Sequence, residues 1–114
     1  MSAAHAHQNA WSLHVSLDRA SGVATLVVQG RIGSAGAADL RAAIEESAVA
    51  GERLLLDLEA VDYLSSAGLA VLQQAARHVH DEGGSLELAR ASEPVKMALR
   101  LAGPIPHLNL ELRS

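Results

Sequence analysis

The pattern of apolar and polar residues predicts alternating strands and helices. Apolar runs of strand length occupy residues 11–18, 23–30, 53–58 and 85–89, and a short alternating stretch follows at 107–112. The turn residues Ala20-Ser21-Gly22 separate the first two runs, which indicates an antiparallel hairpin. The run at 54–58 is almost continuously apolar, which is typical of a strand buried on both faces.

Apolar residues recur at helical spacing in three further segments. These predict helices at about residues 37–50, 66–81 and 92–102, and each segment is followed by a glycine that can end a helix. Ser92 is the expected N-cap of the third helix, with Pro94 inside its first turn. The glycine-containing segment 31–36 is expected to be a loop that leads into the first helix.

The order of these elements predicts one α/β domain. Residues 53–89 read as a strand–helix–strand unit, whose parallel crossover is almost always right-handed. The preceding hairpin adds an antiparallel pair, so we expect a mixed, mostly parallel sheet with helices largely on one face. The domain is expected to span residues 11–114, after a loose N-terminal tail at residues 1–10.

Composition and charge exclude several classes of protein. Hydrophobic residues make up 49% of the chain but aromatics only 2%, which predicts a core of Leu, Val, Ile and Ala. The net charge of −4 carries no basic stripe, which argues against direct binding to nucleic acid. No apolar run approaches the roughly 20 residues that cross a bilayer, and the N-terminus does not resemble a signal peptide. We therefore expect a cytoplasmic protein without membrane insertion.

The sequence indicates no catalytic, cofactor or metal site. Cysteine is absent, so disulfide and thiolate chemistry are excluded. His78 and His80 are two residues apart on a predicted helix and point to different faces, unlike a helical metal-binding pair. Leu64 stands where a nucleophile elbow needs its first glycine, and segment 31–36 matches no phosphate-binding or dinucleotide loop. We expect a protein that is not an enzyme.

Two adjacent serines, Ser65 and Ser66, stand where the second helix is predicted to begin. A serine at that position can cap the helix, which is worth about 1 kcal/mol. It can also offer a hydroxyl whose phosphorylation changes the charge of an exposed helix terminus. The small residues Ala67 and Gly68 would let a partner surface approach that hydroxyl closely.

The segment DYLSSAGLAVL, residues 62–72, resembles the signature of STAS domains, in particular the bacterial anti-anti-sigma factors, or anti-sigma factor antagonists. The resemblance extends over residues 12–103. Matching the family's Gly-Leu pair to Gly68-Leu69 implies that Ser66 is the residue phosphorylated by a partner kinase. It also implies a partner-binding surface that comprises Arg31, Gly33, Asp62, Tyr63, Ser65, Ser66, Ala67, Gly68 and Leu69.

The resemblance implies a switch in transcriptional signalling. The chain would bind an anti-sigma factor that is a serine kinase of the GHKL type, phosphorylation of Ser66 would break the complex, and a PP2C-type phosphatase would restore it. The family often has acids where this chain has Arg31, Gly33 and Ser65. These differences leave a second hypothesis open. In it, the chain is a constitutive STAS interaction module, either in a stress-signalling scaffold or in a lipid-transport ABC system. A further hypothesis is that Arg31 pairs with a phosphate on Ser66.

Overall fold

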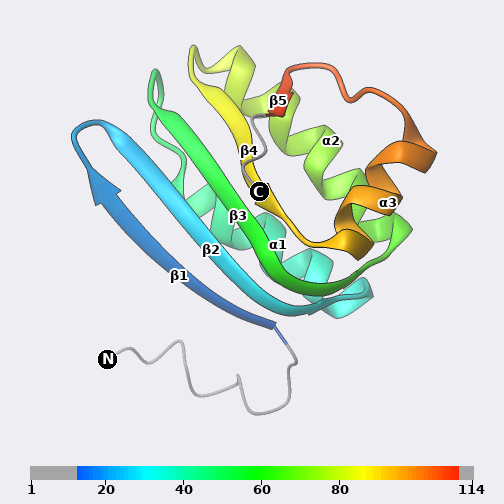
Figure 1. Cartoon of the computed structure of the whole chain (residues 1–114). Helices are drawn as coiled ribbons and strands as arrows, with labels where there is room; N and C mark the ends of the chain where they lie inside the picture. Colours follow the sequence, from blue (N-terminus) through cyan, green and yellow to red (C-terminus); the bar gives the residue numbers. More distant parts are fainter. Residues whose placement is uncertain (1–12, 111–114) are drawn as a thin grey trace.

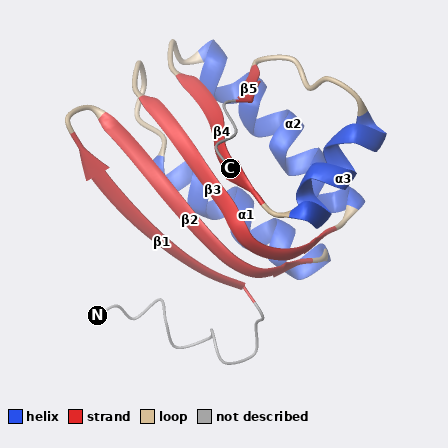
Figure 2. Ribbon diagram, in the orientation of Figure 1, coloured by secondary structure: helices blue, strands red, loops and turns tan. Residues whose placement is uncertain are grey.

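The computed structural model describes residues 13–110, which form one sheet with helices on one of its faces (Figures 1 and 2). In chain order the elements are β1 (Leu13–Ala20), β2 (Val23–Ile32), α1 (Ser34–Ser47), β3 (Arg53–Leu64), α2 (Ser66–Asp81), β4 (Ser85–Ala91), α3 (Glu93–Ala102) and β5 (Leu108–Leu110). The expected tail at residues 1–10 lies outside the described residues.

The sheet is mixed and mostly parallel, which confirms the predicted fold class. Its five strands follow the chain order β1-β2-β3-β4-β5. β1 runs antiparallel to β2, whereas β2, β3, β4 and β5 pair in parallel. Ser21 and Gly22, which join β1 to β2, both have positive φ angles, of 54° and 77°. Two such residues form the tight turn whose twist matches a β-hairpin.

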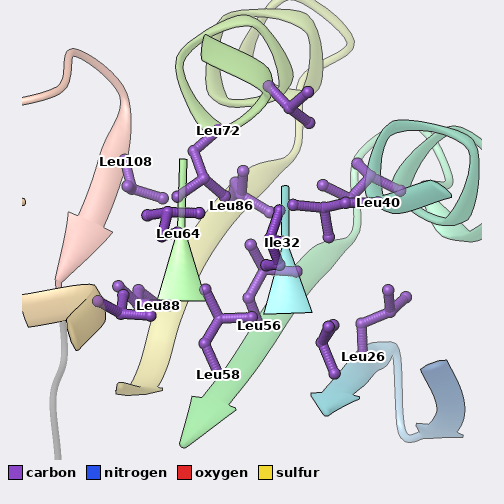
Figure 3. Packing of buried hydrophobic residues seen from close by; sticks show 14 of the residues in the cluster. Leu26, Ile32, Leu40, Leu56, Leu58, Leu64, Leu72, Leu86, Leu88 and Leu108 are labelled. Atoms are coloured by element: carbon purple, nitrogen blue, oxygen red, sulfur yellow. The ribbon is translucent and has the colours of Figure 1, made fainter. Parts of the chain in front are cut away.

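The core lies between the sheet and the helices. Leu26, Leu56 and Leu88 project from neighbouring strands and are completely buried, and Leu40 of α1 and Leu72 of α2 close the layer from the helix side (Figure 3). Burial therefore alternates along the strands, and Leu55 is only half-buried. The expectation that this strand is buried on both faces was wrong, because no helix within residues 13–110 covers the second face.

The first four strands end later in the chain than the sequence pattern predicted. β2 continues through Arg31 to Ile32, and β3 shows the largest difference, since it continues to Leu64 rather than ending at residue 58. The pairing of β2 with β3 shifts register between Val27 and Gln29 and again between Gly30 and Arg31. Both irregularities place the extra residue on β3, where the buried residues Leu58, Val61 and Leu64 are three positions apart. The period of two on which the prediction relied is lost along this part of β3, whereas the alternation continues along β2.

The first helix begins earlier than predicted, at Ser34 rather than near residue 37. Gly33 is its N-cap, so segment 31–36 is a strand end and a first helical turn rather than a loop. Gly36 permits this, because a Cβ at that position would lie 2.6 Å from the backbone oxygen of Arg31. The boundaries predicted for α2 and α3 are confirmed, and the Ser92 hydroxyl accepts a hydrogen bond from the Val95 amide at 3.4 Å.

The face of the sheet that carries no helix holds an ion pair between an exposed arginine and a buried glutamate. The guanidinium of Arg53 on β3 donates to both carboxylate oxygens of Glu87 on β4, at 2.8 and 3.0 Å. Glu87 is 7% exposed. The hydrogen bonds from Arg53 lower the pKa of Glu87 below its ordinary value, and this effect outweighs the opposing effect of burial.

Replacing Arg53 with methionine is expected to lower the free energy of unfolding at neutral pH by about 1–2 kcal/mol, because it leaves a buried carboxylate unpaired. A carboxyl group whose pKa is lowered by folding stabilises the protein above its unfolded pKa, and this contribution is lost as pH falls through the folded pKa. The difference between the two proteins should therefore shrink on acidification. Urea unfolding from pH 7 to pH 3 measures it, with exposed Arg77→Met as the control. A difference that does not change with pH would contradict this account.

Candidate functional site

Ser66 is the first residue of α2 and lies directly after the end of β3. The backbone N–H of Ser65 donates to the carbonyl oxygen of Ile32 at 2.9 Å, which ties the start of α2 to the last residue of β2. Because β2 and β3 are parallel, their carboxyl ends meet at one edge of the sheet. The loops and helix starts at that edge form the candidate site.

The two serines have different roles in this geometry. The Ser65 hydroxyl accepts a hydrogen bond from the Gly68 backbone N–H at 3.1 Å and caps α2. Ser66 is exposed, and its hydroxyl makes no hydrogen bond within residues 13–110. The first helical turn contains no acidic side chain, so the positive end of the helix dipole is not offset there. Ser65 therefore caps the helix, and the hydroxyl of Ser66 is exposed to solvent.

Gly68 holds this helix start close to the ends of the strands. It is buried, and a Cβ at its position would lie 2.6 Å from Cδ1 of Leu64 and 2.7 Å from Cγ2 of Ile32. Both of these side chains belong to the core (Figure 3). Because Gly68 has no side chain, the first turn of α2 can pack directly against the core.

Arg31 and Tyr63 form a neighbouring part of the site. They are register partners on β2 and β3, and the Arg31 guanidinium lies 4.5 Å from the centroid of the Tyr63 ring. This is a cation–π contact, and it places the guanidinium over an aromatic ring on the strand next to its own. Asp62 is exposed on β3, and Gly33 is partly exposed between β2 and α1. The hypothesis that Arg31 binds a phosphate on Ser66 remains a prediction.

The sequence pattern missed the contribution of α3 to the site. A cleft of about 300 Å³ separates the start of α2 from α3, and it is lined by Leu64, Ser65, Ser66, Leu69, Ala98, Leu101 and Ala102. Leu101 is 82% exposed, although it is a large apolar residue. The sequence does indicate that Leu101 is exposed, because it is out of phase with the buried residues Val95 and Leu99 of the same helix. The site is therefore a hydroxyl beside an apolar cleft.

The part of the chain that the structure describes was also compared with the requirements of a metal site and of a membrane-spanning helix. Within residues 13–110, no three His, Cys, Asp or Glu side chains gather closely enough to hold a metal ion. None of the helices there combines the length and the apolar character that crossing a membrane requires. His80 is exposed on the surface, and its ring stacks on the ring of His107, which is also exposed, with ring centroids 3.8 Å apart.

Comparison with known proteins identifies the family of this chain. The family model for the STAS domain matches residues 14–113, so the chain belongs to the STAS domain family. A protein of Bordetella bronchiseptica named "Putative anti-sigma factor antagonist BtrV" is 32% identical over 92 residues, which cover 80% of this chain and 79% of that protein. The family expectation drawn from residues 62–72 is therefore confirmed.

Solved structures show the same fold. An anti-sigma factor antagonist from Mycobacterium paratuberculosis superposes with a TM-score of 0.72 at 25% identity, over 87% of this chain and 85% of that one. The anti-sigma factor antagonist SpoIIAA in its unphosphorylated form superposes with a TM-score of 0.67 at 18% identity, over 85% of this chain and 87% of that one. SpoIIAA of Bacillus is also known in a phosphorylated form, which superposes with a TM-score of 0.64 at 15% identity, over 85% and 90% of the two chains.

Proposed function

We propose that this protein is an anti-sigma factor antagonist whose binding to its partner is switched off by phosphorylation of Ser66. The partner is an anti-sigma factor with serine kinase activity of the GHKL type, and a PP2C-type phosphatase reverses the modification. The docking surface comprises the nine residues named from the family resemblance, Arg31, Gly33, Asp62, Tyr63, Ser65, Ser66, Ala67, Gly68 and Leu69, together with Leu101. The proposal includes a cytoplasmic location for this cycle.

One observation carries this proposal: the hydroxyl of Ser66 is exposed and unbonded at the edge of an apolar cleft, while Ser65 caps the helix. A serine needed only for stability would be engaged in the cap. The names of the relatives add support, since BtrV and the mycobacterial protein are both described as anti-sigma factor antagonists. The phosphorylated form of SpoIIAA shows that a protein of this fold can carry the modification.

The chemistry requires no catalytic group from this chain. The Ser66 oxygen attacks the γ-phosphorus of ATP held by the kinase, ADP leaves, and the hydroxyl proton passes to a base of the kinase. Hydrolysis by the phosphatase then returns inorganic phosphate and the free serine. The antagonist is the substrate of both enzymes, which fits a site without a neighbouring general base. Its own role is binding.

The geometry explains how one phosphate can act on the complex without unfolding the domain. A phosphate adds about −1.5 to −2 charges at neutral pH, and a helix N-terminus stabilises negative charge. The same phosphate would stand beside Leu69 and the exposed side chain of Leu101, so a partner packed over the cleft would have to desolvate it. Shifting binding from 99:1 to 1:99 requires about 5.5 kcal/mol, and loss of such a contact can supply much of this.

The proposal is tested by incubating the protein with its kinase partner, identified by co-purification, and ATP. Mass spectrometry should find one added phosphate, located on Ser66, and Ser66→Ala should abolish it. Ser66→Glu should weaken partner binding at least tenfold, whereas Ser66→Ala should retain it. The matched control is Ser65→Ala, which loses the cap but should still be phosphorylated at Ser66.

The same experiment distinguishes the phosphorylation switch from the second hypothesis, a constitutive STAS interaction module. The observation that favours this module is the presence of Gly33 and Ser65 where relatives often have acids. Partner binding that is equal in Ser66→Ala, Ser66→Glu and the natural protein would support the module and contradict the switch. Phosphate found on Ser65 instead of Ser66 would contradict the assignment of the two serines.

A further inference from the structure

We propose that a second cavity, between α3 and β5, binds a linear amphipathic anion, specifically a medium-chain fatty carboxylate. The cavity has a volume of about 390 Å³, which is within the range of small-molecule sites. Its apolar wall is made by Leu99, Ile105, Leu108 and Leu110, and Lys96 and Arg100 also line it. The comparisons with relatives did not suggest this site, and it does not depend on the role proposed for Ser66.

The cavity exists because the sheet ends abruptly at β5. Only three residues of β5 pair with β4, and Leu108 lies in register with Leu86 at the border of the core. Leu110 is in register with Leu88, but it is 55% exposed whereas Leu88 is fully buried. Among residues 13–110, the layer between sheet and helices is therefore only partly filled beyond β4. Figure 1 shows the segment from α3 to β5 arching over this end of the molecule.

The segment that joins α3 to β5 makes a contact at each of its ends. Gly103 ends α3 with a φ of 83°, and its backbone N–H donates to the carbonyl oxygen of Leu99 at 3.0 Å. His107, at the other end of the segment, stacks on His80 of α2 with the two rings inclined by 12°. These contacts hold the segment beside the cavity.

The lining selects the shape of the ligand. The apolar side chains of the wall, Pro104 included, are all aliphatic, and no aromatic residue lines it to stack on a flat ring. A flexible alkyl chain can follow such a surface, and each methylene that it buries there adds to the affinity. A linear tail therefore suits the cavity better than a ring system does.

The two cations select the charge of the ligand. Lys96 and Arg100 are four residues apart on α3 and therefore project from the same side of the helix. Lys96 pairs with Glu93 at 3.6 Å, whereas Arg100 forms no ion pair within residues 13–110. Lys96 and Arg100 are thus a local pair of cations on a chain whose net charge is −4. They can bind a carboxylate by charge-assisted hydrogen bonds while its tail enters the apolar cavity.

Sodium decanoate, used below its micellar concentration, is the probe, and the full chain is titrated by calorimetry and by amide NMR. The proposal expects saturable 1:1 binding, with shifts concentrated in residues 96–110. Arg100→Gln and Lys96→Gln should each weaken binding about tenfold. Leu110→Asp should abolish it, because it puts a carboxylate at the cavity. Met97→Asp is the matched control, since Met97 is also on the surface, 53% exposed, but does not line the cavity.

Three outcomes would overturn the proposal. The first is an absence of saturable binding to the natural protein. The second is equal binding of decyltrimethylammonium, which has the same tail and the opposite charge. The third is binding by Leu112→Ser but not by the natural chain, which would show that the chain's own C-terminal residues occupy the cavity. Ser66→Ala should bind decanoate normally, so failure of the phosphorylation switch leaves this test unaffected.

Discussion

Replacing Gly68 with alanine is expected to lower the free energy of unfolding by about 1–3 kcal/mol, through overpacking. Alanine is the better helix former by about 1 kcal/mol, so helix propensity alone predicts the opposite sign. The steric effect should win, because the new Cβ would lie 2.7 Å from Cγ2 of Ile32 and 2.6 Å from Cδ1 of Leu64. The Ile32 methyl belongs to a stiff, branched side chain in the core and cannot easily move aside.

The same substitution should also reduce partner binding, because the first turn of α2 must move away from β2 to relieve the overlap. This would stretch the hydrogen bond from Ser65 to Ile32, now 2.9 Å long. Denaturant unfolding and binding to the kinase partner measure the two effects. Gly33→Ser is the matched control for the unfolding measurement, since a Cβ there meets nothing within 4 Å and the φ of −88° suits any residue. A Gly68→Ala protein that is as stable as the natural one would contradict the close approach.

Leu56→Ala is expected to be the most destabilising single truncation, by about 3–4 kcal/mol. Leu56 is fully buried on the central strand β3, where neighbours on β2, β4 and the helices surround it (Figure 3). The sheet is held by pairing on both sides of β3, so it cannot collapse into the cavity that the truncation leaves. Loss of transfer free energy and an unfilled cavity therefore act together.

Denaturant unfolding measures this loss, and Leu17→Ala is its control. Leu17 is also a strand leucine, but it is 48% exposed on β1, and its truncation should cost less than about 1 kcal/mol. Equal losses in the two variants would contradict the assignment of the core. The site should remain intact in whatever fraction of the Leu56→Ala protein stays folded, because Leu56 does not line the cleft beside Ser66.

The most accurate predictions from sequence concern elements whose signals are local. The helix at Ser66–Asp81 and the one that follows Ser92 were placed correctly, because a cap, a period near 3.6 and a terminal glycine mark each of them. The boundaries of β2, β3 and α1 were misplaced. The ends of β2 and β3 depend on irregular pairing between strands that are distant in sequence, and the start of α1 depends on the close approach of Gly36 to the Arg31 backbone, which hydrophobic periodicity does not record.

For the candidate site, the sequence by itself determined the family, the position of Ser66 at a helix start and the small residues that follow it. These features are encoded in consecutive residues and in local backbone preferences. Only the tertiary structure decided that Ser65 is the cap and Ser66 is exposed, that Arg31 stacks on Tyr63, and that Leu101 of α3 borders the same cleft. The physical reason is that α3 lies beside Ser66 only after the chain has folded. The residues of α3 are more than 25 positions away in the sequence, and no short-range pattern predicts contacts over that separation.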